Sequence, residues 1–159
     1  MTVDWKAFLR RLRAYPTGIH KIRPPATQER IRAVEEKVGK LPSELADMLG
    51  LFNGAELFKK NGFMLSLFGL TEEPPLPPFE WGEEWYIDRF TPMWRHEGKN
   101  RQNDWAIAMM NYGELILLDG QGKIKKWDTS ERTWAPGNVS FDQWLEEVLR
   151  EGDEFLNED

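Results

Sequence analysis

Histidine and cysteine, the residue types that most often bind transition metals, are nearly missing from this sequence. The chain has no cysteine and two histidines, His20 and His96, which lie far apart and form no His-x-x-x-His pair. Zinc sites are typically built from Cys and His at short spacings, and a chain without cysteine has neither thiolate chemistry nor disulfide bonds. Both histidines have polar or loop-like neighbours. We therefore expect them at the surface and predict no metal site.

Patterns typical of phosphate binding and nucleophilic catalysis are absent as well. None of the four serines lies in Gly-x-Ser-x-Gly, and no Gly-Lys-Ser/Thr loop occurs. Gly120 and Gly122 lack the third glycine and the following helix of a dinucleotide-binding loop, so residues 119–122 predict a turn. Pairs such as Glu83-Glu84 carry little information among 27 Asp and Glu. We predict no catalytic residue and no cofactor; a deep pocket with converging polar groups would favour the alternative, an enzyme of unrecognised type.

A segment in the middle of the chain combines acidic and aromatic side chains that suit protein binding. Its candidate contact residues are Glu80, Trp81, Glu83, Glu84, Trp85 and Asp88. Aromatic side chains often anchor interfaces, and carboxylates spaced like phosphates complement a basic cleft. The alternative is that Trp81 and Trp85 belong to the core and that the carboxylates form a solvated face, because large aromatic residues are mostly buried.

Charge is unevenly distributed along the chain, whose net charge is −6. Residues 1–40 hold ten Lys and Arg against four Asp and Glu, whereas residues 41–159 hold eleven against twenty-three. An acidic body repels the phosphate backbone, so we predict no nucleic-acid partner. It would attract a basic protein, although acidity also serves solubility alone.

The N-terminal sequence has no apolar run of signal-peptide length, and no stretch approaches the length of a membrane span. Together with the lack of cysteine, this predicts a cytoplasmic protein without a membrane partner.

Three helices are expected before residue 55. Asp4 and Thr27 are possible N-caps of the first two, Leu41-Pro42 opens the third, and Asn53-Gly54 ends it. An extended connection is predicted for residues 19–26. The helices have apolar stripes formed by Trp5, Phe8, Leu9 and Leu12, by Ile31, Val34 and Val38, and by Leu45, Met48, Leu49 and Phe52.

Most of the remaining chain predicts an antiparallel sheet. A helix with a break near Pro92 is expected within residues 85–95. Ile124 and Trp127 would face opposite sides of the last strand unless a bulge intervenes. Strands are predicted at residues 63–68, 105–110, 115–118 and 123–127.

A final helix follows, for which Ser140 to Gln143 form a capping box and Gly152 is expected as the end. Helices, then a sheet, then a helix indicate one α+β domain over residues 1–159, with helices packed against the sheet.

Blocks of this sequence resemble the SUKH superfamily, the Smi/Knr-type proteins. Residues Ile31 to Gly54 read I-x-x-V-E-E-K-V-G-K-L-P-S-E-L-A-D-M-L-G-L-F-N-G, in which a helix ends at Gly and Leu-Pro opens another that ends in Asn-Gly. Residues 106–124 resemble the family's strand and turn block, and Ser140-Phe141-x-x-Trp144-Leu145 resembles its closing helix. The resemblance covers about residues 27–150 and follows an N-terminal helix and connection over residues 1–26. Residues 79–104 depart from it.

The resemblance implies an α+β fold with helices against a strongly bent antiparallel sheet, and binding rather than catalysis. Bacterial members resemble immunity proteins that neutralise a cognate polymorphic toxin by stoichiometric binding, and fungal members are regulators of cell-wall synthesis. The expected function is therefore toxin neutralisation, with a basic toxin domain as the partner. The alternative is a regulatory or scaffold protein of the same fold that acts through protein contacts without a toxin.

Overall fold

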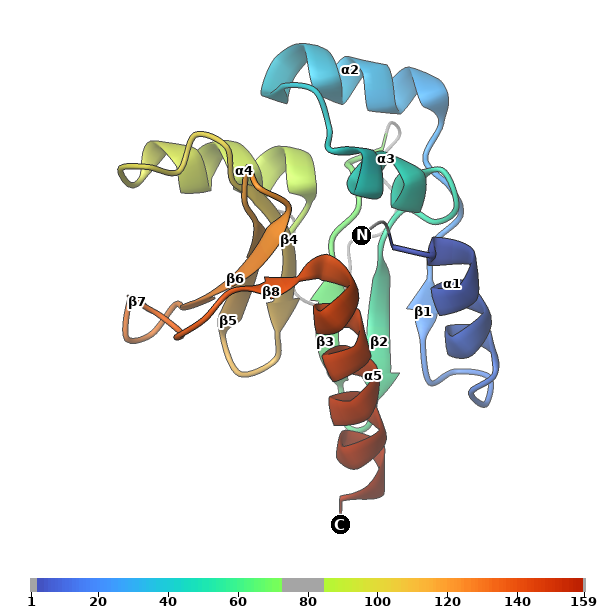
Figure 1. Ribbon diagram of the computed structural model, residues 1–159. Coiled ribbons are helices and arrows are strands. Elements are labelled where there is room, and N and C mark those ends of the chain that lie inside the picture. The colour runs from blue at the N-terminus through green and yellow to red at the C-terminus, as the bar shows by residue number, and fades with distance from the viewer. Residues whose placement is uncertain (1–2, 73–84, 159) are drawn as a thin grey trace.

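The computed structural model describes residues 3–72 and 85–158, and within them it places five helices and eight strands (Figure 1). In chain order the elements are α1 (Trp5–Arg13), β1 (Lys21–Ile22), α2 (Gln28–Val38), α3 (Ser43–Leu49), β2 (Ala55–Lys59), β3 (Phe63–Leu67), α4 (Ile87–His96), β4 (Trp105–Met110), β5 (Glu114–Leu118), β6 (Lys123–Asp128), β7 (Thr133–Trp134), β8 (Val139–Ser140) and α5 (Phe141–Asn157).

All eight strands form one open antiparallel sheet. Its order is β1-β2-β3-β4-β5-β6-β7. Strand β8 lies off this path and pairs with the start of β6, whereas β7 pairs with its end. Figure 1 shows the sheet bending between the β1–β3 part and the β4–β8 part, with α5 running alongside β2 and β3. The predicted α+β class, with helices against a bent antiparallel sheet and a C-terminal helix, is confirmed.

Side-chain caps begin three of the helices where the sequence predicts them. The Asp4 carboxylate accepts the Ala7 N–H at 3.0 Å, and the Thr27 hydroxyl accepts the Arg30 N–H at 3.1 Å. Ser140 and Gln143 form the complete capping box of α5. These bonds satisfy N–H groups that have no partner within the first turn. The third helix ends at Leu49, several residues before the predicted stop at Asn53.

Both faces of β6 are covered, which resolves the imperfect alternation of its sequence. The register between β5 and β6 is regular, so Ile124 and Trp127 point to opposite faces. Trp127 meets Trp94 of α4, whereas Lys126, on the same face as Ile124, reaches Glu147 of α5. The pairing irregularity lies between β4 and β5, at Ala106 and Ala108.

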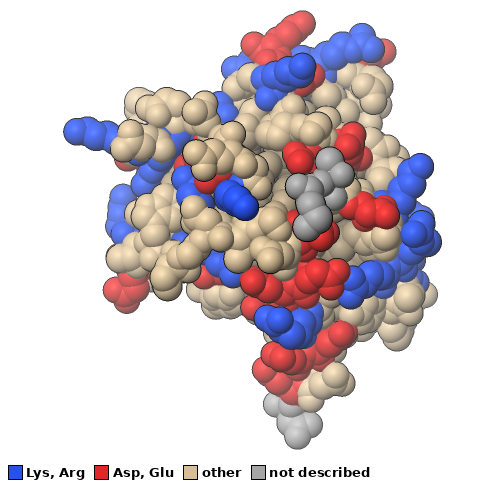
Figure 2. Space-filling model, in the orientation of Figure 1, with Lys and Arg blue, Asp and Glu red and all other residues tan. Residues whose placement is uncertain are grey.

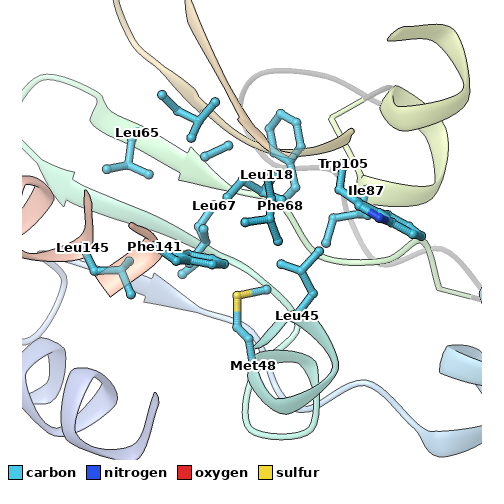
Figure 3. Close-up of a cluster of buried hydrophobic side chains, with 14 of the residues drawn as sticks. Leu45, Met48, Leu65, Leu67, Phe68, Ile87, Trp105, Leu118, Phe141 and Leu145 are labelled. Atoms are coloured by element: carbon cyan, nitrogen blue, oxygen red, sulfur yellow. The ribbon is translucent and has the colours of Figure 1, made fainter. Parts of the chain in front are cut away.

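The hydrophobic core joins α3, the central strands and α5 (Figure 3). Leu45 and Met48 of α3 point towards Leu67 of β3, and Phe141 and Leu145 approach from α5. All five are buried. The apolar stripes predicted from helical spacing therefore do face the core.

Helix α5 continues through Gly152 to Asn157, so the predicted end at Gly152 is wrong. The reason is packing. A Cβ atom at Gly152 would lie 2.2 Å from Cζ of Phe58, so the absent side chain admits the Phe58 ring of β2. Phe58 is fully buried at φ 60°, a conformation that is rare for a bulky residue. Strand β2 itself lies in a segment to which the sequence patterns assign no element.

Helix α4 also continues past the predicted break at Pro92. Pro92 is exposed, and the residues around it tie the helix to the start of β4. The Thr91 hydroxyl accepts the Ala106 N–H at 3.0 Å, and the Trp94 indole donates to Asp104 at 3.0 Å. These contacts hold the helix on both sides of a residue that lacks a backbone donor.

Candidate protein-interaction surface

Four of the six predicted contact residues, Glu80, Trp81, Glu83 and Glu84, lie outside the described residues. Trp85 and Asp88 lie within them: Trp85 is the first described residue after the gap, and Asp88 lies in the first turn of α4. The ring of Trp85 is partly buried and lies 6.0 Å from that of Phe68, against the core. Trp85 and Asp88 are thus the two described residues of the candidate segment, and they lie at its C-terminal end.

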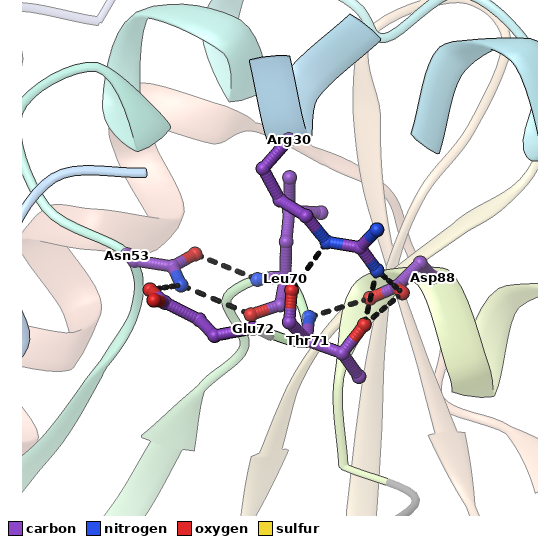
Figure 4. A network of polar contacts seen from close by, with 6 residues as sticks. All are labelled: Arg30, Asn53, Leu70, Thr71, Glu72 and Asp88. Carbon is purple, nitrogen blue, oxygen red and sulfur yellow. Dashed lines mark hydrogen bonds and ion pairs between the residues drawn. The ribbon is translucent and has the colours of Figure 1, made fainter. Parts of the chain in front are cut away.

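Asn53 fixes the chain where it leaves β3 towards that segment (Figure 4). Its side-chain oxygen accepts the Leu70 N–H at 2.7 Å, and its amide nitrogen donates to the Leu70 carbonyl at 2.9 Å and to Glu72 at 2.8 Å. The amide therefore pairs with Leu70 as a neighbouring strand would. Asn53 is buried, so these bonds satisfy groups that water does not reach.

Close backbone contact explains why glycines accompany Asn53. A Cβ atom at Gly69 would lie 2.1 Å from the Asn53 carbonyl oxygen, and one at Gly54 would lie 2.6 Å from the Leu67 carbonyl oxygen. The Asn-Gly pair, predicted as a helix stop, is in fact a docking point for the end of β3. The residue types hint at a tight turn, but the partner segment at residues 69–70 has no signal in the sequence.

Asp88 joins Thr71, on the other side of residues 73–84, to Arg30 of α2 (Figure 4). Its carboxylate accepts the Thr71 N–H at 2.9 Å and the Thr71 hydroxyl at 2.6 Å, and it forms an ion pair with Arg30 at 3.0 Å. Arg30 also donates to the carbonyl and hydroxyl oxygens of Thr71. The Asp88 side chain is 11% exposed. Its carboxylate is thus engaged in an internal network that ties Thr71 and the first turn of α4 to α2.

His20 is partly buried, so the expected surface position is wrong for this residue; His96 is exposed as predicted. The ring of His20 packs against those of Tyr15 and Phe58, at 4.9 and 4.7 Å, and its Nδ1 accepts the Phe58 N–H at 3.1 Å. Burial lowers the pKa of His20 to about 4, and it raises that of Tyr15, which donates to Asp153, to about 12. This cluster fixes the ring of Phe58.

Within residues 3–72 and 85–158, no three His, Asp or Glu side chains gather as a metal site would require. No helix in the same ranges is both long enough and apolar enough to cross a bilayer.

A groove of about 700 Å³ lies between the α2–α3 junction and the β5–β6 turn, and Lys40, Glu44, Arg95 and Asp119 are among its lining residues. These charges are mixed in sign, and burial lowers the pKa of Arg95, which donates to two backbone carbonyls.

The described surface has separate regions of opposite charge. Figure 2 shows acidic side chains gathered over α5 and basic ones over α1 beside it. Tyr112, 63% exposed in the β4–β5 turn, donates to Glu114 at 3.3 Å, and burial raises the pKa of Glu114. Trp134 of β7, 43% exposed, lies among basic residues instead. Two exposed aromatic side chains therefore lie in surroundings of opposite charge.

Comparison with known families gives one match. The family described as SMI1 / KNR4 family (SUKH-1) matches residues 25–147, from just before α2 into α5. No curated protein matches the sequence. The matched range contains the Asn53 docking point, the Asp88 network and the whole sheet except β1.

Proposed function

The chain belongs to the SMI1/KNR4 family (SUKH-1), and from this premise we propose that it is a protein-binding module that neutralises a cognate bacterial toxin by stoichiometric binding. The family match over residues 25–147 is the observation that carries the proposal. The SUKH superfamily includes immunity proteins, and its members are generally not catalytic. The mechanism would be occlusion of the toxin's active site, without any reaction on the inhibitor.

The contact surface that we propose is the segment with Glu80, Trp81, Glu83, Glu84, Trp85 and Asp88. Its carboxylates complement a basic cleft such as that of a nuclease, and its tryptophans supply apolar anchors. The hydrogen bonds of Asn53 and Asp88 support this choice, because they hold Leu70, Thr71 and Asp88, the described residues that flank the segment, in fixed positions. In this proposal the accessible part of Asp88 contributes less than the three acids and two tryptophans that precede it.

The test is a toxicity assay with the toxin domain encoded beside the gene of this protein. Co-expression of the full chain should restore growth, and titration calorimetry should give one-to-one binding. The double variant E83K/E84K should weaken binding by about tenfold or more, because it places two cations opposite a basic cleft. The matched double variant E131K/E154K makes the same charge change at two exposed positions, one in the turn between β6 and β7 and one on α5. It should retain protection.

Failure to restore growth, with no binding to the adjacent gene product, would refute toxin neutralisation. Capture of a defined cellular regulator by the same chain would then favour the regulatory or scaffold alternative. Equal loss of binding in both double variants would contradict the proposed contact surface alone, because it would show a dependence on total charge.

A further inference from the structure

Three tryptophans from separate parts of the chain form a cluster on the α4 side of the sheet. Trp94 of α4, Trp127 of β6 and Trp134 of β7 lie 4.9 to 5.6 Å apart between ring centroids, all edge to face. Trp127 and Trp134 are direct partners in the β6–β7 register, so both rings stand on one face. Trp94 is buried beneath them, while Trp134 remains 43% exposed. The exposed indole is therefore held by two aromatic neighbours.

Basic side chains are built into this cluster. The Arg101 guanidinium lies 3.5 Å from the centroid of Trp94 and donates to the Trp94 carbonyl. The Lys125 ammonium lies 4.8 Å from the centroid of Trp134 and pairs with the buried Asp104 at 3.0 Å. Cation–π contacts and ion pairing fix both cations. Binding at this place would cost little side-chain entropy, because the aromatic and cationic groups are already ordered.

A pocket of about 380 Å³ opens over the exposed side of the cluster. It is lined by Lys99, Asn100, Arg101, Lys125, Trp127, Trp134, Ala135 and Asn138. The lining contains three cations and no carboxylate, although residues 41–159 carry twice as many acidic as basic residues. Lys125 is paired with Asp104, so Lys99 and Arg101 supply the positive charge that a ligand would meet beside the aromatic wall.

We propose that this tryptophan pocket binds an acidic segment of a protein partner. Trp134 provides the anchor for an apolar side chain, and Lys99 and Arg101 pair with the carboxylates beside it. Trp and Arg are enriched among interface hot spots, and a rigid exposed indole is typical of them. The net charge of −6 on the whole protein disfavours a polynucleotide, whose phosphates extend beyond the pocket, more than a short acidic peptide. The inference rests on the proposed protein-binding function but not on a toxin as the partner.

The test uses a synthetic peptide with alternating Glu and Leu residues, its Gln and Leu analogue, and oligouridylate as probes of the full-length protein. The NMR signal of the Trp134 indole, assigned with the variant W134F, should shift on addition of the Glu peptide and stay in place with the Gln peptide. Raising the salt concentration should weaken the shift, because the pairing is electrostatic. No toxin is needed, so this experiment and the protection assay fail independently.

Variants separate the pocket from general charge. Lys99→Glu should weaken binding of the Glu peptide by about tenfold, whereas Lys6→Glu, the same change on the exposed face of α1, should leave the affinity unchanged. Unchanged thermal unfolding of both variants establishes that the fold is intact. The proposal is overturned if the Glu and Gln peptides shift the indole equally, if neither shifts it, or if oligouridylate binds more tightly than the Glu peptide.

Discussion

At the scale of single residues, His20 links the protonation state of the protein to the geometry of Phe58. Its Nδ1 accepts the Phe58 N–H, so the neutral ring is the form that fits. Burial lowers the pKa of His20 from 6.5 to about 4, which means that the unfolded chain binds a proton more readily than the folded one. The contribution of His20 to stability is therefore complete above pH 6.5 and is lost as the pH falls towards 4.

We expect the free energy of unfolding to decrease by about 1 to 2 kcal/mol between pH 7 and pH 4.5 through His20 alone, a value that allows for solvent at part of the ring. The variant His20→Asn keeps an acceptor for the Phe58 N–H but does not titrate, so its stability should depend less on pH by that amount. Urea unfolding of both proteins across this range measures the difference. Parallel curves would show that His20 does not titrate with folding. Tyr15, with a pKa of about 12, stays protonated throughout.

Residue types predicted the local roles of polar side chains better than their long-range partners. Asp4, Thr27 and Ser140 cap helices as expected, because a cap bonds within its own first turn. Asn53 was predicted to stop a helix, but its amide bonds to Leu70, seventeen residues away. Likewise the carboxylate of Asp88 was predicted at a contact surface, and its bonds to Thr71 and Arg30 depend on a fold that the spacing does not reveal.

At the scale of elements, Gly152 gives the sharpest test of packing. An alanine in a helix interior is normally more stable than a glycine by about 1 kcal/mol. Here the added methyl group would lie 2.2 Å from the Phe58 ring, which is buried and held by Tyr15 and His20. We expect Gly152→Ala to destabilise the protein by about 2 to 4 kcal/mol, because neither the helix nor the ring has room to move.

Gly50→Ala is the matched control for this change. Gly50 has helical φ at the end of α3, and a Cβ atom there would make ordinary contacts at 3.6 Å. Its unfolding free energy should stay within about 0.5 kcal/mol of the parent. Leucine at position 58 removes the ring that the added methyl group would meet. The double variant G152A/F58L should therefore lose less unfolding free energy than the sum of the two single changes, and strict additivity would contradict the proposed contact.

Element prediction succeeded where the periodicity was local and failed where tertiary contacts decide. The amphipathic stripes of α1, α2 and α5 and the strands β3 to β6 lie where they were expected. Strand β2 went unassigned, because Phe58 is the one strong strand former in it, Ala, Glu and Lys are depleted in strands, and Glu56 is buried by its position in the sheet. The ends at Pro92 and Gly152 were wrong for a related reason: contacts with β4 and with Phe58 outweigh weak helix propensities.

At the scale of the whole molecule, the family match begins at residue 25, but the packed unit includes α1. Trp5 is 3% exposed, and its ring meets those of Phe8, Phe52 and Phe141 at 5.3 to 5.9 Å. These rings come from α1, from the segment that follows α3 and from α5. The N-terminal helix therefore shares the central core. We therefore expect residues 1–159 to unfold as one cooperative unit.

Trp5→Ala tests this expectation, because it opens a cavity where α1, α5 and the segment after α3 meet. It should lower the unfolding free energy by about 3 to 5 kcal/mol while the helical circular dichroism and the tryptophan fluorescence still change in one coincident transition. Trp5→Phe should cost less, since it retains an aromatic ring and removes an indole N–H that finds no acceptor within the described part of the chain. Met93→Ala, at an exposed position on α4, should change stability by less than about 0.5 kcal/mol. An early separate loss of helix signal in Trp5→Ala, with the main transition unchanged, would show that α1 is an appendage and that the folding unit starts near the family boundary.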